Sequence, residues 1–370
     1  MIVRCSPFSR MSENKPPFLE ILPNRVRRNY TGGALLETWC GREGQDDNRP
    51  EDWIASTTEA VNPGLLALAG EGLTAVRLPD GRTASLAQLL EQAPQYYLGE
   101  EHFRHRGAAL GFLGKLLDSA IRLHVQAHPT ADFARRHLGS RYGKFESYVI
   151  LGFREGSAPT LRLGFQNAPS RQEWKRIIED QDIAAMDACF EEIPLQVGEV
   201  WCVPGGMPHA IGAGVLMLEV MEPSDLVVRC EFERHGIVVP PDGRFMKRGL
   251  DFCLDIFDYQ SRSVEEIRKA CRLDPRSTGE PGEELLVGPE QTDCFEVVRV
   301  KADAPVRLKG GLLEVLLVVD GQGVLQSEEA EAPLAPSSRF IIPAGQDGVW
   351  LKPEKSQTLE ILKIRPGRNL

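Results

Sequence analysis

Four side chains in the middle of this 370-residue chain have the types and spacing to bind one metal ion. Gln126 and His128 are two residues apart, so on a β-strand their side chains point to the same face. Lys144 and Glu146 repeat this spacing, and a further histidine, His209, follows a turn-forming segment. Strands that present these residues to a common space would bring two imidazoles and a carboxylate together.

The segment from Gly198 to His209 reads as a strand, a tight turn and a ligand. Valine and tryptophan at 200–203 suit a strand, Pro204 ends its pairing, and Gly205-Gly206 makes a turn. His209 then starts the next strand and faces inward. The spacing G-x5-P-x-G-x2-H matches the second motif of the cupin superfamily, whose jelly-roll barrels present a metal ligand in this way.

Two imidazoles, a carboxylate and an amide form an N2O2 donor set that suits a borderline divalent ion such as zinc, with room for water or substrate. Each residue also has a structural interpretation. A lone strand histidine is usually hydrogen-bonded, glutamine is an uncommon ligand, Lys144 and Glu146 can form a solvated strand face, and Pro-Gly-Gly can be an ordinary hairpin turn. The ordered co-occurrence on a β-rich stretch favours the metal site.

The same region resembles the class I (type I) mannose-6-phosphate isomerases of the cupin superfamily, and the compact size resembles their short bacterial form. The resemblance rests on Val125-Gln-Ala-His-Pro129, Gly143-Lys-Phe-Glu146, His209-Ala-Ile-Gly212, Leu218-Glu219 and Ser224-Asp225-x-x-x-Arg229. Thr31-Gly-Gly33 and Trp53-Ile-Ala-Ser56 resemble the family's N-terminal region. The similarity is dense over residues 110–232 and weaker elsewhere.

The resemblance implies site roles for individual residues. It implies one zinc ion per chain, held by Gln126, His128, Glu146 and His209. It implies that Arg229 and Glu219 lie at the reacting end of a sugar, and that Lys144 helps to hold the substrate. Lys115 stands where the family often has a lysine, and we assign it to substrate binding.

One position departs from the family pattern. The family usually has a serine two residues before the glutamine, associated with the substrate phosphate, and here that residue is His124. By strand alternation His124 shares the face of Gln126 and His128. It can bind phosphate, especially as an imidazolium, serve as an extra metal ligand, fill the phosphate pocket, or pack as a structural histidine.

An aldose–ketose isomerase acting through a cis-enediol(ate) needs a base and a positive field where charge develops on the oxygens. Zinc can supply that field as a Lewis acid, and Arg229 adds a fixed cation. Glu219 is the candidate base, or the residue that orients it; alternatively it only pairs with Arg229. Lys144 is either a phosphate contact or a solvated lysine.

Four functions follow in order of preference. The first is a zinc-dependent interconversion of mannose 6-phosphate and fructose 6-phosphate. The second is the same chemistry on another, possibly unphosphorylated sugar, which His124 motivates. The third is a non-catalytic sugar-binding cupin, and the fourth is an iron-dependent cupin oxygenase, which usually has more histidine ligands.

The elements that must position these residues predict a mainly β fold with helical insertions and two cupin (jelly-roll β-barrel, RmlC-like) domains. The predicted division is a loose N-terminal lead at 1–20, a metal-binding cupin domain at 21–240 with helical insertions at about 84–117 and 170–190, a helical connection and linker at 241–289, and a degenerate cupin domain at 290–370. The last of these contains no histidine, so we expect no metal there.

Periodicity predicts the individual elements. Strands are expected at 120–125, 148–153, 193–203, 214–220, 226–232, 295–300, 312–319, 324–326, 340–342, 349–351 and 359–364. Helices are expected at 85–92 with Ser85 as N-cap, within 170–190, at 245–257 and at 264–271. Residues 108–117 fit a helix or a strand, and the acidic stretch 280–290 fits a linker.

Composition limits the class of protein. Hydrophobic residues make up 42% and charged residues 26%, which is ordinary globular usage. The net charge of −10, without a basic block, argues against a nucleic-acid partner. No apolar run suggests a membrane span or a signal peptide, although Met11 could be the true start. Eight scattered cysteines suggest free thiols and a cytoplasmic location; the oligomeric state stays open.

Overall fold

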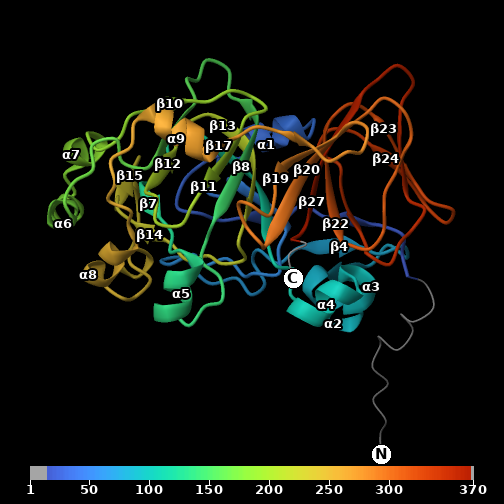
Figure 1. The fold of residues 1–370 in the computed structure, drawn as a ribbon, viewed down its shortest axis with the longest axis horizontal. Coiled ribbons are helices and arrows are strands. Elements are labelled where there is room, and N and C mark those ends of the chain that lie inside the picture. Colours follow the sequence, from blue (N-terminus) through green and yellow to red (C-terminus); the bar gives the residue numbers. More distant parts are fainter. Residues whose placement is uncertain (1–14, 368–370) are drawn as a thin grey trace, which may run out of the picture.

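A computed structural model describes residues 15–367 of the chain. Four antiparallel sheets make up most of it, so the prediction of a mainly β fold is confirmed. Figure 1 shows two β-rich halves side by side, one built mostly from the middle of the chain and one from its C-terminal third. Most of the predicted N-terminal lead, residues 1–14, lies outside the described residues.

The first half pairs a seven-stranded sheet with a five-stranded sheet. The order of the seven strands is β17 (Arg272–Leu273), β11 (Val200–Val203), β8 (Glu146–Phe153), β13 (Val215–Met221), β6 (Leu113–Ser119), β3 (Glu51–Ala55) and β2 (Arg25–Val26). The order of the five is β10 (Ile193–Pro194), β9 (Thr160–Leu163), β12 (His209–Ile211), β7 (Gln126–Ala127) and β14 (Val228–Arg229). Side chains of both sheets, such as Trp201 and Leu163, form one buried core between them.

The second half pairs a nine-stranded sheet with a four-stranded sheet. The order of the nine strands is β18 (Arg276–Ser277), β19 (Glu283–Val287), β20 (Phe295–Ala302), β27 (Leu359–Pro366), β22 (Glu314–Asp320), β25 (Arg339–Ile342), β1 (Leu19–Ile21), β4 (Ala75–Arg77) and β5 (Thr83–Ser85). The order of the four is β21 (Val306–Arg307), β26 (Trp350–Pro353), β23 (Gly323–Gln326) and β24 (Glu331–Leu334). A separate core, with Val318 and Leu351 among its members, lies between these sheets.

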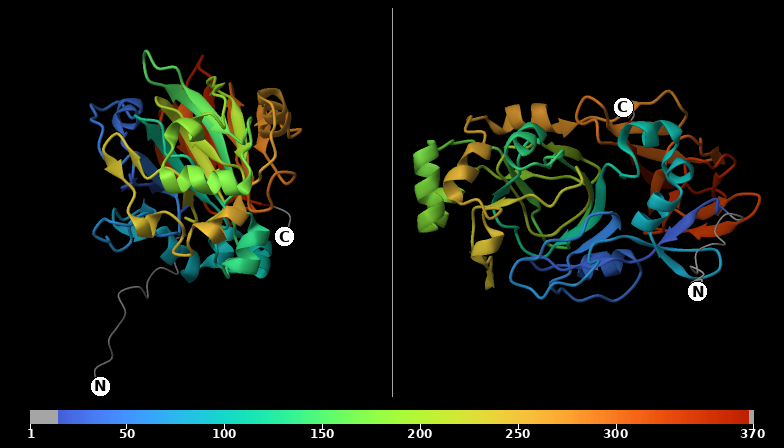
Figure 2. Two further views of the ribbon diagram at one scale, coloured as in Figure 1. Left: turned by 90° about the vertical axis from the view of Figure 1, so that its left-hand side faces the viewer. Right: turned by 90° about the horizontal axis from the view of Figure 1, so that it is seen from below.

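A third core joins the two halves. The outer faces of the seven-stranded and nine-stranded sheets pack together through residues such as Leu116, Leu218, Leu317 and Ile364. The close approach is possible because β6 has a glycine at position 114: a Cβ there would stand 2.9 Å from Ile364 Cδ1. Seen from below in Figure 2, the strands of the first half form a ring beside the C-terminal sheets.

Helices cover the ends and sides of the sheets. They are α1 (Ala34–Trp39), α2 (Leu86–Gln92), α3 (Pro94–Leu98), α4 (Glu100–Arg106), α5 (Ala131–His137), α6 (Arg171–Asp180), α7 (Ile183–Asp187), α8 (Leu250–Cys253) and α9 (Val264–Cys271). Two 3-10 turns, Pro241–Gly243 and Leu254–Ile256, and a small hairpin of β15 (Glu233–Arg234) with β16 (Ile237–Val238) complete the elements. Within residues 15–367, none of the helices combines the length and apolar character needed to cross a lipid bilayer.

Several predicted elements are confirmed and others are wrong. Helices at 171–180 and 183–187 confirm the predicted helical stretch, and 108–117 contributes to strand β6. The predicted strand at 120–125 is irregular, the strand at 226–232 shrinks to β14, and the helix at 245–257 begins only at 250. Ser85 is the N-cap of α2, but its side chain makes no capping hydrogen bond.

The predicted linker at 280–290 is wrong, because Glu283–Val287 forms β19 and pairs with β20. Alternating side chains and a neighbouring strand outweigh the acidic composition there. The early strands β1, β4 and β5 join the C-terminal sheet rather than the first half, which the predicted boundary at residue 240 did not anticipate. The described cysteines are all free, as predicted.

Candidate metal centre and pocket

The inner face of the seven-stranded sheet changes from apolar to charged toward one end. Side chains alternate along a strand, so Glu146 shares the face of Ile150 on β8, and Glu219 shares the face of Met217 on β13. Lys115 on β6 is the register partner of Glu219. The charged residues therefore continue the inner face of this sheet beyond its apolar core.

The five-stranded sheet brings the remaining candidates to the same end. His209 at the start of β12 pairs with Gln126 on β7, and Gln126 pairs in turn with Arg229 on β14. His128 follows directly after β7. The backbone register thus gathers residues from three separate segments of sequence into one row.

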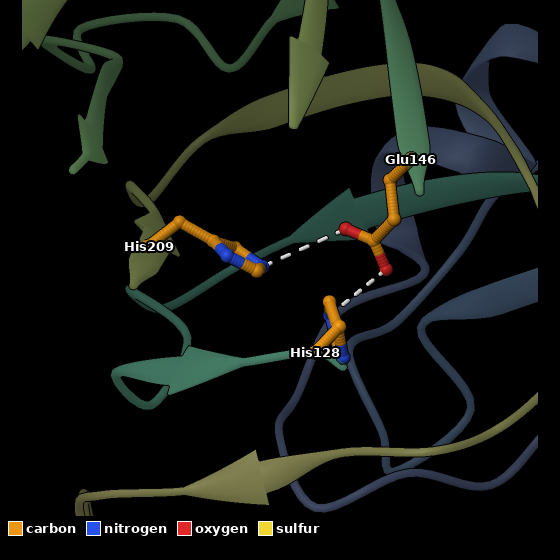
Figure 3. A group of neighbouring side chains, drawn as sticks. All are labelled: His128, Glu146 and His209. Carbon is orange, nitrogen blue, oxygen red and sulfur yellow. Dashed lines mark ion pairs between the residues drawn. The ribbon is translucent and has the colours of Figure 1, made fainter. Parts of the chain in front are cut away.

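His128, Glu146 and His209 form a buried cluster, with one ligand atom of each lying within 4.8 Å of the others. Figure 3 shows the two rings pointing toward the carboxylate from neighbouring strands. His128 Nε2 is 3.0 Å from Glu146 Oε1, and His209 Nε2 is 3.6 Å from Glu146 Oε2. This is a compact, buried set of two nitrogens and a carboxylate.

The hydrogen bonds of the two rings indicate their tautomers. His128 Nδ1 lies 2.8 Å from the carbonyl oxygen of Leu226, and His209 Nδ1 lies 3.0 Å from that of Met207, so each Nδ1 carries the proton and donates it. Each Nε2 then presents a lone pair toward an anionic oxygen, and His128 Nε2 has no hydrogen-bond partner. Acceptors that converge in this way are stabilised by a cation between them. Metal-binding histidines also usually donate a hydrogen bond from the other ring nitrogen, often to a backbone carbonyl oxygen.

The protonation states also suit a metal. Burial lowers the pKa of His128 to about 4 and lowers the pKa of His209, so both rings are neutral near pH 7. Burial alone would raise the pKa of Glu146, but the ammonium group of Lys144, 3.0 Å away, helps to hold it well below its usual range. Two neutral imidazoles and an ionised carboxylate are the forms that ligate zinc.

The fourth predicted ligand, Gln126, reaches this cluster through its amide. Gln126 Nε2 lies 3.3 Å from His209 Nε2 and can donate to it. A metal would take the amide oxygen rather than the nitrogen. Gln126 is therefore adjacent to the cluster with its nitrogen foremost.

A pocket opens beside the cluster, with residues of both sheets in its lining. Seven of the predicted site residues line it, namely Lys115, His124, Gln126, Lys144, Glu146, Glu219 and Arg229. His128 and His209 are not among the lining residues, but both contact Glu146, which is. The structure thus brings all nine predicted site residues into one neighbourhood.

Glu219 pairs with Lys115 and not with Arg229, so the alternative Glu219–Arg229 ion pair is wrong. Lys115 Nζ lies 3.2 Å from Glu219 Oε2 and 3.1 Å from Glu51 Oε1, and all three side chains are buried. Burial raises the pKa of Glu219 to about 8, against the opposing effect of Lys115. Glu219 can therefore change its protonation state near neutral pH.

Arg229 is a buried cation without a carboxylate partner. Its Nη1 donates to the Gly243 carbonyl oxygen at 2.7 Å, and no carboxylate of residues 15–367 forms an ion pair with it. Burial and the nearby Arg28 lower its pKa to about 10. By contrast, Lys144 Nζ is paired with Glu146 Oε1 at 3.0 Å, which excludes the alternative of a solvated lysine.

His124 lines the pocket in a neutral state. Burial lowers its pKa to about 4, with further lowering by Arg229 and Arg122, so the imidazolium considered from the sequence does not form near pH 7. Asn29 Nδ2 lies 3.4 Å from His124 Nδ1 and donates to it, which leaves the proton on Nε2. That Nε2 is buried and forms no hydrogen bond of ordinary geometry within the described residues, although the backbone of Ile237 lies close enough to raise the pKa of the ring. His124 therefore offers an unused N–H donor.

The sequence did not identify several further residues of the pocket, among them Glu51, Arg28 and Tyr148. Glu51 receives hydrogen bonds from Tyr30 Oη at 2.6 Å and Trp53 Nε1 at 2.7 Å, and Arg28 Nε approaches it at 3.5 Å. Tyr148 Oη donates to Glu146 Oε2 at 2.5 Å. The two-residue spacing from Glu146 could have indicated Tyr148, whereas Glu51 and Arg28 carry no local signal.

Comparison with known proteins identifies relatives. No family model matches the chain. The Bacillus subtilis protein GmuF, named a probable mannose-6-phosphate isomerase, is 33% identical over 240 residues, covering 64% of this chain and 70% of the relative. A mannose-6-phosphate isomerase of Streptococcus mutans is 32% identical over 240 residues with the same coverage of 64% and 70%.

Solved structures agree in fold. The mannose 6-phosphate isomerase of Bacillus subtilis superposes with a TM-score of 0.72 and 20% identity, over 94% of this chain and 99% of that chain. A mannose 6-phosphate isomerase bound with zinc and yttrium superposes with a TM-score of 0.67 and 16% identity, over 95% and 100%. From the sequence relatives it follows that this chain belongs to the mannose-6-phosphate isomerase family, a family of isomerases.

Proposed function

We propose that this chain is a zinc-dependent isomerase that interconverts mannose 6-phosphate and fructose 6-phosphate through a cis-enediol(ate). One observation carries the proposal: two neutral imidazoles and an ionised carboxylate converge as acceptors at the wall of a pocket that also holds an uncompensated arginine. Relatives named as mannose-6-phosphate isomerases and a neighbouring structure that contains zinc support it.

His128, Glu146 and His209 would hold the zinc ion, with Gln126 as the fourth ligand after its amide turns. This donor set fits a zinc site that keeps a position for substrate. When bound, zinc would supply a positive field for the sugar oxygens on which negative charge develops.

Glu219 is the proposed base. It would take the proton from C2 of the aldose and return it to C1 to give the ketose. A carboxyl group with a pKa near the working pH can both accept and donate a proton, and burial raises the pKa of Glu219 to about 8. Lys115, 3.2 Å away, would hold this carboxyl group in place.

Arg229, Lys144 and His124 would bind and orient the substrate. Arg229 is a cation without an anionic partner, so an oxyanion of the sugar or its phosphate would complete it. His124 would donate its Nε2–H to the phosphate as a neutral group. Lys144 would contact the sugar from beside Glu146.

We further infer that each half of the molecule is a cupin jelly roll, made of two facing antiparallel sheets around a core. The metal-binding barrel would span most of residues 21–240 and the degenerate barrel residues 290–370. Strands β1, β4 and β5 would belong to the latter although they come early in the chain.

The deciding experiment is a coupled assay for fructose 6-phosphate formed from mannose 6-phosphate, run on zinc-loaded protein beside its Arg229→Lys variant. We expect turnover by the wild type and lower turnover by the variant with unchanged zinc content, because an ammonium does not replace the planar guanidinium. Turnover of free mannose alone would shift the substrate to an unphosphorylated sugar. Absence of turnover in folded, zinc-replete protein contradicts the proposal.

A further inference from the structure

The second half of the molecule repeats the pattern of an inner face that turns from apolar to charged. On β27, Lys363 and Arg365 continue the face of Leu359 and Ile361, which lie in the core between the nine-stranded and four-stranded sheets. Three carboxylates continue the same face on neighbouring strands, namely Glu283 on β19, Glu296 on β20 and Glu314 on β22. Five charged residues thus occupy one end of an interior that is otherwise apolar.

These residues form a connected ion network. Lys363 Nζ lies 2.8 Å from Glu283 Oε2 and 3.3 Å from Glu314 Oε1. Arg365 Nε lies 2.6 Å from Glu296 Oε2, and Arg365 Nη1 lies 3.7 Å from Glu314 Oε1. Most of the surface of each side chain is buried, so their desolvation must be compensated by good partners.

The compensation is incomplete at Glu314. Its Oε1 faces both cations, but its Oε2 is buried and has no hydrogen-bond partner among the described residues. A buried carboxylate oxygen without a donor is costly. Glu314 is 4% exposed, so bulk water does not satisfy it.

A pocket lies over this network. All five charged residues belong to its lining. Arg307, Lys309 and the Gly310-Gly311 turn form part of its rim. Lys309 and Arg307 are already paired with Glu280 and Asp347, each at 2.7 Å. Among the charged side chains of the floor, Glu314 Oε2 is the atom without a hydrogen-bond partner in the described part of the chain.

We propose that this charged floor, Glu283, Glu296, Glu314, Lys363 and Arg365, binds a neutral polyol such as a sugar or sugar alcohol. A hydroxyl group can donate to Glu314 Oε2 while its oxygen accepts from Lys363 or Arg365. Three carboxylates against two cations disfavour an anion. The two cations, interleaved with the carboxylates, disfavour a metal ion. Apolar residues such as Leu285, Val306 and Leu312 also line the pocket and can pack against the C–H faces of a sugar.

The site is separate from the metal pocket and is tested by calorimetric titration of the full chain. The probes are D-mannitol and D-mannose as neutral polyols, ethanolamine as a cation and inorganic phosphate as an anion. We expect a polyol to bind, and Glu314→Gln to weaken that binding by about tenfold or more, since the amide removes one acceptor. Glu284→Gln, which removes a carboxylate paired with Arg299 outside this pocket, should bind like the wild type.

The outcomes separate this site from the catalytic one. Binding in the metal pocket would survive Glu314→Gln, so equal affinity in both proteins overturns the proposal, as does a preference for ethanolamine or phosphate. Wild-type crystals soaked in the polyol give a measurement that needs no variant. Density beside Glu314 supports the proposal, and its absence there overturns it whether or not the isomerase assay succeeds.

Discussion

At the scale of single residues, the candidate metal centre is defined by the ring nitrogens that are not engaged in hydrogen bonds to the backbone. The two imidazoles donate their Nδ1–H groups to backbone carbonyl oxygens, and the lone pairs on their Nε2 atoms face Glu146. Acceptor atoms that face one another repel, and a bound cation would remove this repulsion. Metal binding should therefore depend on each ring individually.

His209→Ala removes one nitrogen ligand from a buried cluster. We expect loss of stoichiometric zinc together with loss of isomerase activity, because the remaining donors cannot close the site. Metal content is measured by mass spectrometry on the purified protein. The matched control is His105→Ala, an exposed position on α4, which should keep both; a His209→Ala protein that retains one zinc per chain would refute the ligand assignment.

Glu51 links acid stability to the pocket. Burial alone would raise its pKa, but Lys115 and Arg28 bring it down to about 2 from an ordinary 4.5. A carboxyl group whose folded pKa is lowered stabilises the protein above its unfolded pKa, and this contribution, at most about 3 kcal/mol, disappears as pH falls from 4.5 toward 2. Urea unfolding at several pH values should show that the free energy of unfolding falls less steeply with acid in Glu51→Gln than in the wild type. Identical pH profiles would show that Glu51 does not contribute to the acid sensitivity of the fold.

Residue chemistry was predictable where it was local. The two-residue spacing in Gln126–His128 and Lys144–Glu146 is a direct property of strand geometry, and the structure places these side chains together. Glu51 and Arg28 come from a distant segment whose position depends on sheet order. No local pattern encodes that order, so their place in the pocket could not be derived from the sequence.

At the scale of elements, the backbone of residues 129–131, just after β7, packs closely against Gly143 and Gly205. A Cβ at Gly143 would stand 2.5 Å from the Pro129 carbonyl oxygen, and one at Gly205 would stand 2.7 Å from the Thr130 backbone nitrogen. Backbone atoms cannot move aside as a flexible side chain can. These contacts fix the path of the chain next to His128.

Gly143→Ala should therefore weaken zinc binding without touching a ligand. The methyl group forces the 129–131 backbone away and displaces His128, so we expect at least a tenfold loss in metal affinity, measured by competition with a chelator. Gly152→Ala is the control, since its Cβ would meet only Leu216 Cδ2 at 3.9 Å. Equal affinities in the two variants would show that the segment has room to adjust.

Element types followed from periodicity, while their partners did not. The strands predicted at 295–300 and 359–364 form and extend to residues 302 and 366, because their alternation is sustained. The strand at 283–287 was missed because its sequence is acidic and flanked by glycine and proline, and pairing with β20 decides its structure. Residues 120–125 show the opposite error: they have the composition of a strand but no ladder partner.

At the scale of the whole molecule, the core between the two halves couples them. Ile364 lies in this core, opposite the close approach of β6 at Gly114. Because both sheets lose buried contacts when either unfolds, the halves should unfold together. We therefore expect the two halves not to behave as independent folding units.

Ile364→Ala should destabilise the chain by roughly 2–5 kcal/mol and reduce the coupling between the halves. Circular dichroism and zinc release, followed in one urea series, should coincide in the wild type and separate in the variant. Ile361→Ala, which opens a cavity inside the C-terminal core only, should lower stability without separating the signals. Separate transitions already in the wild type would contradict the coupling.

The pairing of β1 with β25 has a consequence for biosynthesis. Leu19 aligns with Ile341, so β1 waits for more than 300 further residues to be synthesised before its partner emerges. At ~5–20 residues per second the wait is on the order of tens of seconds. Throughout that time the edge of β1 that will pair with β25 is open to neighbouring nascent chains. The exposure ends only when β25 has been synthesised and pairs with β1.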